Sequence, residues 1–462
     1  MRPFEIIIPL LLALYLLWRH PRPLWIRLAP AAVLVITLLH FAIEGYRWQM
    51  IPLYVLTSLL GLSALLKIRS PSDWNPVGSY LTVILLAVAT VLPVVLPVPS
   101  IPEPDGPYPV GTTSFELTDP SRVELYSGKE EPRRFQIQVW YPAEPNPGDR
   151  HAPWMSRADV FGPAIATYIG MPSFFLDHLA LVKLPAFQDA RVAQTDEAFP
   201  VILFSHGWNG FSAQNSGQAL QLASHGFMVV AVQHTYGAVV TVFEDGTIAK
   251  NYPEALPSGA QDDEYDLAAD KLANQWAGDL AWVLDQLAVM NTNVRSPFAG
   301  KLDLSRVGVY GHSTGGGAAI QFCGSDPRCK ALLGQDPFMR PVSSEVLENG
   351  VSQPAFFMFS QRWADETDSL NNRLFSPFFV KSEQALGAVS IDGTAHYDFS
   401  DLPRLSPLTP QLGLKGPIPG SRVTAILDDY LLSFFEFTLK GVPSDLFDPA
   451  NGKYDEVQFI HN

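Results

Sequence analysis

One stretch constrains the fold of this chain more than any other: an apolar strand that runs directly into a glycine-rich turn and a helix. Residues 307–310 are rich in β-branched and aromatic side chains, and Gly311-His312-Ser313-Thr314-Gly315 follows with no spacer before a run of small residues. A G-x-S-x-G motif in this setting is typical of a nucleophile elbow, in which a sharp turn lifts the serine hydroxyl above the edge of a sheet. The stretch predicts a nucleophilic Ser313, the alternative being a glycine-rich structural turn.

Apolar runs of strand length recur on both sides of this stretch and predict the sheet that carries it. They are short and separated by helical patterns, as in parallel sheets that are buried on both faces. The expected strands are residues 200–205, 227–233, 307–310, 331–334, 355–359 and 388–391, and the expected helices are 212–225, 265–290 and 315–323. Residues 113–118 and 135–142 alternate like an antiparallel edge. The predicted fold class is a doubly wound α/β domain with a mostly parallel sheet.

Residues 151–195 do not fit this alternation of strands and helices. They contain more large apolar side chains than a surface loop needs. Two roles are open for this insertion: an acyl pocket or membrane-facing patch over the sheet, or extra helices that enlarge the core.

A serine hydroxyl is a weak nucleophile without a neighbouring base, and histidine is the usual base. His396 follows the last expected strand in Asp392-Gly393-Thr394-Ala395-His396. A loop at the carboxyl edge of the sheet would bring it back over Ser313, so we expect His396 to be the base. His234, at the end of another expected strand, is the main alternative.

The acid that would orient this histidine has two candidates. Asp365 follows the second strand after the elbow, which is the commonest position for the acid in folds of this kind. Asp336 ends the first such strand, where a carboxylate would be costly to bury without a partner. The residues alone leave both open. In either case the chain order of serine, acid and histidine is that of the α/β-hydrolases.

Two backbone N–H groups are expected to stabilise the anion that forms when the serine attacks an ester. One belongs to Thr314, at the start of the helix after the turn, where the helix dipole adds a positive potential. The other belongs to Trp208 in Phe204-Ser205-His206-Gly207-Trp208, which is typical of an oxyanion loop after a strand. His206 and His312 flank these turns and are expected to shape them rather than to act as bases.

Several of these motifs occur in the order found in a known family. The chain resembles the platelet-activating factor acetylhydrolase family, the plasma and intracellular type II branch of the α/β-hydrolases, at FSHGWNGFSAQNSGQALQLASHGFMVVAVQH (residues 204–234), at GHSTGGGAA, at the strand end Asp336-Pro337-Phe338-Met339 and at IDGTAHYDFSDLP (residues 391–403). In that family the acid follows the strand directly after the elbow, so the resemblance implies Asp336. It also implies hydrolysis of short or oxidised acyl groups from the sn-2 position of phospholipids, without calcium or another cofactor.

Four apolar runs precede this domain, at residues 3–18, 24–41, 49–66 and 80–98. Each is close to the roughly 17–25 residues that a helix needs to cross a bilayer, which favours a bundle of about four transmembrane helices over core helices or a cleaved signal. The basic residues of the loops gather at Arg19, Arg22 and Arg27 and at Lys67 and Arg69. By the positive-inside rule these loops are cytoplasmic, and everything after residue 98 lies on the extracytoplasmic side.

The expected domains are a transmembrane helical domain at 1–98, a proline-rich linker at 99–112 and an α/β-hydrolase catalytic domain at 113–462. Residues 1–98 hold 7 of the 31 basic and 3 of the 46 acidic residues, so the negative charge lies after them. An acidic domain does not favour electrostatic binding of nucleic acid or of anionic lipid headgroups. The expected partners are a small ester or phospholipid substrate and the membrane itself.

Cys323 and Cys329, the only cysteines, are separated by five residues rich in turn formers. They could close a small disulfide loop, which would suit an oxidising compartment, the alternative being two buried free thiols. Two thiols without a nearby histidine do not favour a zinc site, and no metal is expected.

These features together predict an integral membrane protein with an outward-facing serine ester hydrolase domain. A general carboxylesterase or lipase and an acyltransferase with the same triad are the nearest alternatives. An alternative from another class is a four-span transport or sensory protein whose hydrolase-like domain only binds a ligand. The complete set of nucleophile, base, acid and oxyanion loop argues against it, because a binding module needs none of them.

Overall fold

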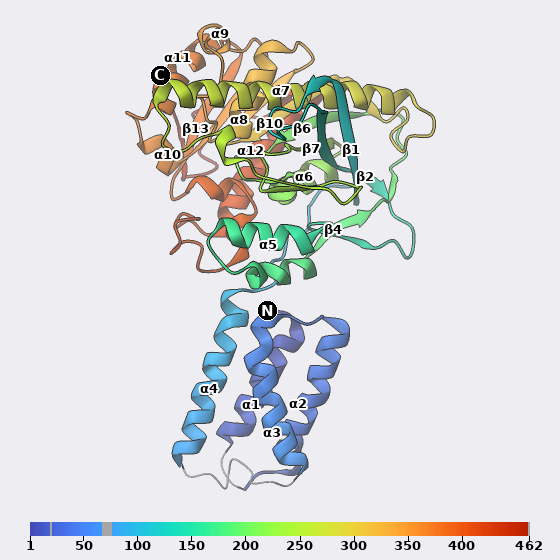
Figure 1. Ribbon diagram of the computed structural model, residues 1–462, viewed down its shortest axis with the longest axis vertical. Coiled ribbons are helices and arrows are strands. Elements are labelled where there is room, and N and C mark those ends of the chain that lie inside the picture. Colours follow the sequence, from blue (N-terminus) through green and yellow to red (C-terminus); the bar gives the residue numbers. More distant parts are fainter. Residues whose placement is uncertain (19–20, 67–75, 461–462) are drawn as a thin grey trace.

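Strands with buried apolar side chains build one mixed sheet that carries helices on both faces (Figure 1). The computed structural model describes residues 1–18, 21–66 and 76–460. The strand order is β14-β13-β12-β11-β10-β6-β7-β2-β1-β4-β3, and β5 pairs with β2. Neighbouring strands run parallel from β13 to β7, whereas β2 is antiparallel to β7 and β1, and β14 is antiparallel to β13. The predicted mostly parallel sheet is confirmed.

The strands of this sheet include the eight that the sequence predicts and four that it does not, namely β3, β4, β5 and β14. In chain order the strands are β1 (Val110–Val123), β2 (Pro132–Glu144), β3 (His151–Pro153), β4 (Lys183–Gln188), β5 (Arg191–Val192), β6 (Phe199–Ser205), β7 (Met228–Gln233), β10 (Leu302–His312), β11 (Ala331–Gln335), β12 (Ala355–Ser360), β13 (Ala385–Ile391) and β14 (Val457–Phe459). A separate hairpin joins β8 (Val240–Val242) and β9 (Ile248–Lys250).

Successive residues of a strand point to opposite faces, and this alternation divides the core in two. Leu203 and Val309 pack with α7 (Asp262–Thr292), α8 (Thr314–Ser325), α9 (Ser344–Asn349) and α11 (Leu370–Lys381) on one face. Phe204 and Tyr310, the next residues, pack with α6 (Ser216–Ser224) and α12 (Gly420–Lys440) on the other. The remaining helices beside the sheet are α10 (Gln361–Asp365), η4 (Ser212–Asn215), η5 (Pro253–Ala255), η6 (His396–Phe399) and η7 (Leu402–Leu405).

The insertion at residues 151–195 adds helices to the core, one of the two roles that its sequence left open, while the role as an acyl pocket or membrane-facing patch stays a prediction. Its helices α5 (Ala158–Tyr168) and η3 (Ser173–Leu181) pack on each other between the sheet and the N-terminal helices (Figure 1). Phe161 and Leu176 join the buried core on the α6 and α12 face. On the outer side Tyr168, Met171 and Phe174 are exposed, Phe174 to 50 %.

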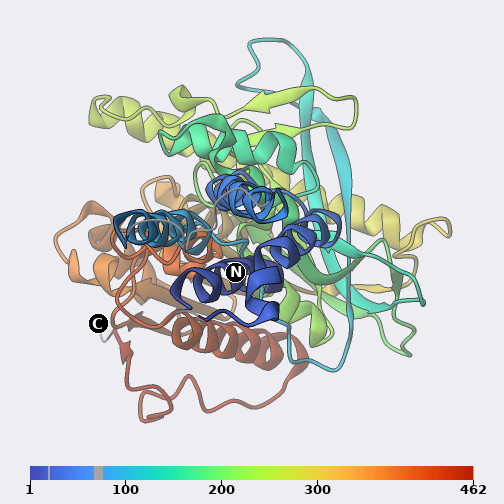
Figure 2. The same ribbon diagram turned by 90° about the horizontal axis from the view of Figure 1, so that it is seen from below.

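The described part of the first hundred residues forms a bundle of four helices, seen end-on in Figure 2. They are α1 (Pro3–Leu17), α2 (Leu24–Ile43), α3 (Ile51–Leu65), which follows η1 (Trp48–Met50), and α4 (Pro76–Val95). By length and composition, two described segments could cross a membrane, Leu24–Ile43 and Trp48–Leu65, whereas the apolar helices Pro3–Leu17 and Tyr80–Val95 are shorter. The sequence predicts four spans. Arg19, Lys67 and Arg69, on which the predicted orientation partly rests, lie outside the described residues.

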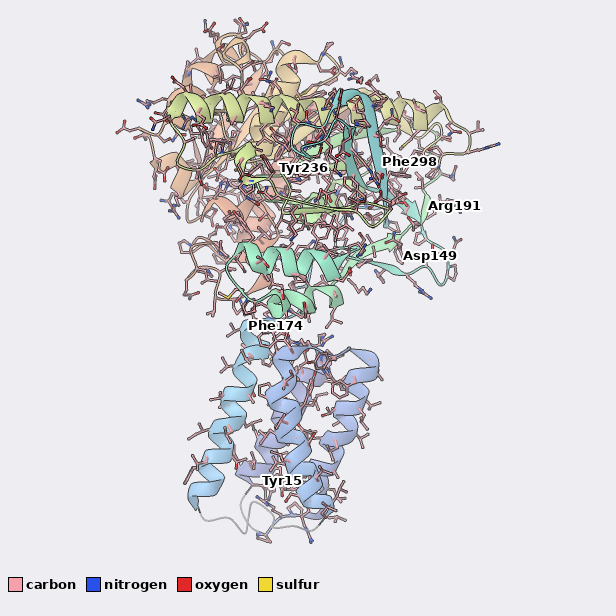
Figure 3. The ribbon with its side chains drawn as sticks, in the orientation of Figure 1. Tyr15, Asp149, Phe174, Arg191, Tyr236 and Phe298 are labelled. Carbon is pink, nitrogen blue, oxygen red and sulfur yellow. A yellow bond between two sulfur atoms is a disulfide. The ribbon has the colours of Figure 1, made fainter. Side chains whose placement is uncertain are left out.

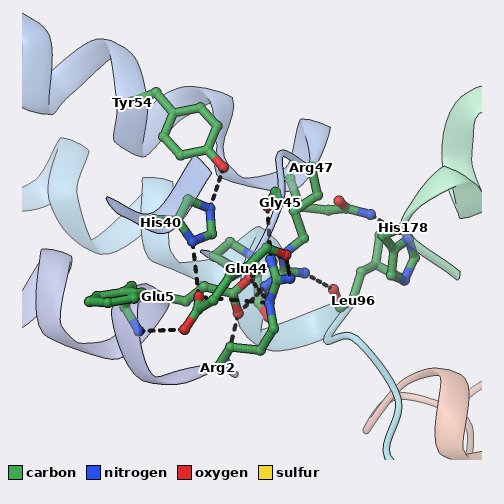
Figure 4. A network of polar contacts seen from close by, with 12 residues as sticks. Arg2, Glu5, His40, Glu44, Gly45, Arg47, Tyr54, Leu96 and His178 are labelled. Carbon is green, nitrogen blue, oxygen red and sulfur yellow. Dashed lines mark hydrogen bonds and ion pairs between the residues drawn. The ribbon is translucent and has the colours of Figure 1, made fainter. Parts of the chain in front are cut away.

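Ion pairs and hydrogen bonds link the bundle helices at the end nearest the sheet (Figure 4). Buried Glu5 pairs with Arg2 at 2.7 Å and with buried Arg47 at 2.6 Å. His40 joins the carboxylate of Glu44 at 2.9 Å to the hydroxyl of Tyr54 at 2.7 Å. Two arginines and two glutamates thereby compensate each other, which buried charges require.

Contacts between polar groups also dock the bundle on the α/β unit. Trp48 Nε1 donates to Phe175 O at 3.2 Å, and Gln49 Nε2 lies 2.7 Å from His178 Nδ1, both partners being in η3. The Ser406 hydroxyl donates to Val95 O, at the end of α4, at 2.7 Å. Figure 3 shows Phe174 at this junction and Tyr15 toward the opposite end of the bundle.

The turn between β10 and α8 is possible only with glycine at two positions. A Cβ at Gly311 would lie 2.2 Å from the carbonyl oxygen of Gly315, and a Cβ at Gly315 would lie 2.1 Å from that of Ser205. We expect Gly315→Ala to destabilise the fold by about 1–3 kcal/mol through overpacking and to lower the melting temperature. Gly452→Ala, whose Cβ would meet no atom within 4 Å, is the control and should leave the melting temperature unchanged. Equal melting temperatures for the two variants would contradict this packing.

Asp428 on α12 shares a small cavity with Asp401 and Arg404. Burial, with the nearby Asp401 charge, raises the pKa of Asp428 to about 8. Between about pH 4 and pH 8 the unfolded chain has released this proton while the folded chain keeps it, so stability falls as pH rises through that window. We expect Asp428→Asn to have a higher melting temperature than the parent at pH 8 and no advantage at pH 4. The neighbouring Asp429→Asn, which removes an ion pair with Lys453, should show no such gain.

Candidate active site

Ser313 occupies the sharp turn between β10 and α8 in a strained backbone conformation. Its φ is 57° and its ψ is −124°, and non-glycine residues in such sparsely populated regions occur mainly at functional sites. The turn is held by hydrogen bonds from Ser313 N–H to Gln335 O at 3.0 Å and from Phe338 N–H to Ser313 O at 2.9 Å. His312 and Thr314 on either side are buried, whereas Ser313 is partly exposed. Ser313 is therefore not closed off from solvent, as a nucleophile requires.

His396 lies at the start of η6, after the loop that follows β13, and contacts Asp336. Its Nδ1 is 2.9 Å from Asp336 Oδ2. Because a carboxylate can only accept, the proton lies on Nδ1 of the neutral ring and Nε2 keeps its lone pair. The side chain of His396 is 19 % exposed and that of Asp336 is fully buried. This is the geometry of a base oriented by an acid.

Ser360, at the end of β12, donates two hydrogen bonds to the carboxylate of Asp336. Its N–H donates to Asp336 Oδ1 at 2.7 Å, and its hydroxyl donates to Oδ2 at 2.6 Å. Asp365, the other candidate acid, is exposed at the end of α10. Within the described residues it has no contact with His396. Geometry thus favours Asp336, the residue that the resemblance implied.

Two contacts hold His396 and the loop that carries it. Trp363 stacks on the imidazole with ring centroids 4.5 Å apart and planes 6° apart. His312 Nε2 lies 3.0 Å from His396 O, and burial holds the pKa of His312 well below its ordinary value. A neutral His312 can donate one hydrogen bond to that carbonyl, which fixes the loop that carries His396. No local sequence pattern points to Trp363, because its stacking depends on how the segment after β12 lies against the loop after β13.

The loop after β6 lies directly against the elbow. A Cβ on Gly207 would be 3.2 Å from the Cβ of Ser313. In the part of the chain that the structure describes, the backbone N–H groups of Trp208 and Thr314 donate to no other protein group. Both can therefore bind an oxyanion at Ser313. The Trp208 indole packs with Leu272 and Trp276, so its side chain belongs to a small satellite core.

His234, the alternative base, lies in the protein interior with Ser205 and Asp279. It is fully buried and hydrogen-bonded to Ser205 and Asp279 rather than to Ser313. A base without access to the substrate cannot assist its hydrolysis directly.

Cys323 and Cys329 are joined by a disulfide bond that closes the loop after α8. Among the described residues, one group brings three potential metal-ligand atoms within 4.8 Å of one another, in Glu5, His40 and Glu44 of the bundle. These atoms already pair with Arg2, with Arg47 or within the group. Two adjacent arginines oppose a cation there, so this group favours ion pairs over a metal.

Comparison with known proteins identifies the family of this chain. The chain matches the family described as platelet-activating factor acetylhydrolase, isoform II, over residues 96–276 and 281–450. It is 27 % identical over 357 residues to a platelet-activating factor acetylhydrolase of Cavia porcellus, covering 73 % of this chain and 77 % of that protein. It is 25 % identical over 389 residues to a probable 1-alkyl-2-acetylglycerophosphocholine esterase of Arthroderma benhamiae, covering 78 % and 93 %.

A solved structure supports the fold independently. The ferulic acid esterase from Streptomyces cinnamoneus aligns with a TM-score of 0.64 at 24 % identity, over 79 % of this chain and 100 % of that one. At this identity the likeness concerns the fold, which is α/β-hydrolase-like. The resemblance predicted from the motifs is confirmed by the family match and the relatives. The chain belongs to the platelet-activating factor acetylhydrolase, isoform II, family and is a carboxylic ester hydrolase.

Proposed function

We propose that this chain is a membrane-anchored serine hydrolase that cleaves short-chain carboxylic esters or sn-2 acyl esters of phospholipids through an acyl-enzyme. The observation that carries the proposal is the contact of His396 with buried Asp336, together with the strained, partly exposed Ser313. The names of the relatives in Cavia porcellus and Arthroderma benhamiae support an acetylated phospholipid as the substrate class.

The proposed mechanism follows the roles of these groups. His396 Nε2 takes the proton of the Ser313 hydroxyl as its oxygen attacks the ester carbonyl, and Asp336 stabilises the imidazolium that forms. The N–H groups of Trp208 and Thr314 bind the oxyanion of the tetrahedral intermediate. His396 then protonates the leaving alcohol, which gives the acyl-enzyme. Water, deprotonated by His396, attacks this ester and releases the acid.

The proposed membrane anchor is the helix bundle. Its N-terminus and the end of α4 lie on the side of the α/β unit, whereas the turn between α1 and α2 lies at the opposite end (Figure 1). Near that turn Arg22 lies over the Tyr15 ring, and Trp18 contacts Trp25, as expected for an aromatic and basic membrane boundary. With the basic end in the cytoplasm, the catalytic domain is extracytoplasmic. Together with the apolar outer surfaces of Leu24–Ile43 and Trp48–Leu65, this supports an integral membrane protein.

The candidate site and the bundle lie on neighbouring parts of the α/β unit, which supports a lipid substrate. The chain runs from His396 through η6 and η7 to Ser406, which binds the end of α4. Helix α5 lies near η6, the helix that begins with His396. Burial raises the pKa of Tyr397 in η6, and the nearby phenol of Tyr168 on α5 adds to this shift. Exposed Tyr168, Met171 and Phe174 would then face the bilayer surface beside the site.

The roles of the two aspartates can be separated by mutation. We expect Asp336→Asn to lower kcat about 10³–10⁴-fold, because the amide no longer fixes the tautomer of His396. The matched change Asp365→Asn, at an exposed residue, should leave kcat within about twofold. Ser313→Ala should abolish both turnover and labelling by a fluorophosphonate, with no change in melting temperature. A large loss from Asp365→Asn with little from Asp336→Asn would contradict the assignment.

The substrate class can be measured with p-nitrophenyl esters of increasing acyl length, using full-length protein in detergent beside Ser313→Ala. We expect serine-dependent hydrolysis to peak at acetyl or butyryl, and a phospholipid with an acetyl group at sn-2 to be hydrolysed in vesicles without added calcium. A peak at long chains would make the enzyme a lipase. Ester exchange with an added alcohol in excess of hydrolysis would make it an acyltransferase, and absence of serine-dependent turnover and labelling would favour a binding role.

A further inference from the structure

A second serine, histidine and aspartate lie in hydrogen-bond contact beside the candidate site. Ser205 Oγ is 2.9 Å from His234 Nε2, and His234 Nδ1 is 2.9 Å from Asp279 Oδ2. Arg133 binds the same carboxylate through Nε at 3.0 Å and Nη2 at 2.6 Å. All four side chains are fully buried, so no substrate reaches them. The set has the contacts of a catalytic triad without the access that one needs.

These contacts fix the protons of two histidines. The carboxylate of Asp279 holds the proton of His234 on Nδ1, and burial lowers the pKa of His234, so the neutral ring accepts from the Ser205 hydroxyl at Nε2. The backbone N–H of His234 donates to Nε2 of His206 at 3.2 Å. Burial lowers the pKa of His206 to about 3. His206 is therefore neutral and carries its single proton on Nδ1.

That proton is directed at the loop beside Ser313. His206 Nδ1 lies 2.7 Å from the carbonyl oxygen of Gly207, to which the N–H of Gly210 also donates at 2.9 Å. The peptide unit between Gly207 and Trp208 is planar and trans, so its C=O and N–H point in opposite directions. Holding the Gly207 oxygen therefore fixes the direction of the Trp208 N–H.

Two residues of helix α7 contact the histidines His206 and His234. Trp276 stacks on His234 with ring centroids 4.2 Å apart and planes 4° apart, and it meets His206 edge-on at 5.2 Å. Trp276 and Asp279 are three residues apart on α7 and so share one face of the helix. A Cβ at Gly237 would lie 2.2 Å from the Trp276 ring, so the turn after β7 packs directly against this indole.

We propose that His206 is a positioning residue for ester hydrolysis: supported by His234, Asp279 and Trp276, its imidazole holds the Gly207 carbonyl so that the Trp208 N–H faces the oxyanion formed at Ser313. The inference rests on the proposed function, because it requires Ser313 to form a tetrahedral intermediate. His206 is fully buried and acts through the backbone of Gly207.

The two ring nitrogens of His206 can be tested separately in the full-length protein. His206→Asn places an amide N–H near the position of Nδ1 and keeps a donor to Gly207, whereas His206→Gln reaches the position of Nε2 and leaves Gly207 without this donor. Losing an oxyanion donor costs about 10²–10³ in kcat, and a misdirected donor should cost less. We expect kcat for p-nitrophenyl acetate to fall about 10–100-fold in His206→Gln and less than about fivefold in His206→Asn, with KM nearly unchanged in both.

A trifluoromethyl ketone distinguishes positioning from a merely structural role, because it forms a tetrahedral oxyanion on the serine. Its Ki should rise in His206→Gln in proportion to the fall in kcat/KM, which a loss of stability in a folded variant would not cause. His178→Leu, which changes a buried histidine at the junction with the bundle, is the control and should leave Ki and kcat unchanged. Equal Ki values for folded His206→Asn and His206→Gln would overturn the proposal. A parent protein without Ser313-dependent turnover or labelling would instead refute the proposed function.

Discussion

The strained backbone of Ser313 is the constraint on which the rest of the site depends. A non-glycine residue in this conformation costs about 1–3 kcal/mol and persists only where its surroundings over-determine it. Hydrogen bonds of Ser313 to Gln335 and Phe338 join the turn to β11 and to the loop after it. Because β10 lies between β11 and β6, the carboxyl ends of both neighbours meet the elbow. The sheet order thus brings Asp336, at the end of β11, and the Gly207 loop, at the end of β6, to the same edge.

Two buried aspartates in this domain bind histidines at the same distance, yet their surroundings give them different roles. Asp336 is satisfied by neutral donors from Ser360, and its partner His396 remains partly exposed. Asp279 is bound by Arg133, and its partner His234 is fully buried. The guanidinium, with the partner His234, lowers the pKa of Asp279 against the effect of burial. His396 is thus accessible for proton exchange with a substrate, as the proposed mechanism requires, whereas the buried His234 suits the proposed role of fixing hydrogen-bond directions.

Buried charges in the helix bundle are also paired with groups of opposite charge. Burying Glu5 or Arg47 alone would cost several kcal/mol, and each is therefore paired with the other at the end of the bundle where α1, α2 and α4 meet. Arg47 also donates to the carbonyl of Leu96, just after α4. The network thus ties the start of α1 to the segment that leads into the α/β unit. Arg47, in the short turn after α2, consequently helps to join the bundle to the α/β unit.

The sequence by itself determined eight strands of the sheet, the helices α6, α7 and α8, and most of the residues assigned to the site, but not the helices α9, α11 and α12. Strands buried on both faces leave short apolar runs, and an elbow leaves a glycine pattern around its serine, so β6, β7, β10 and Ser313 follow from local composition. His396 followed from its place after the last such run. The apolar surplus of residues 151–195 was visible, but not that one side packs into the core while the other stays exposed.

Only the tertiary structure revealed Ser360, Trp363 and the buried set around His234, and it places Asp336, which the resemblance implied, in contact with His396. The residues of each contact lie dozens of positions apart in the chain. The periodicity of apolar residues predicts which face of a strand is buried, but not which loop of a neighbouring strand its side chains contact. That information lies in strand order and register, which the packing of the whole sheet determines.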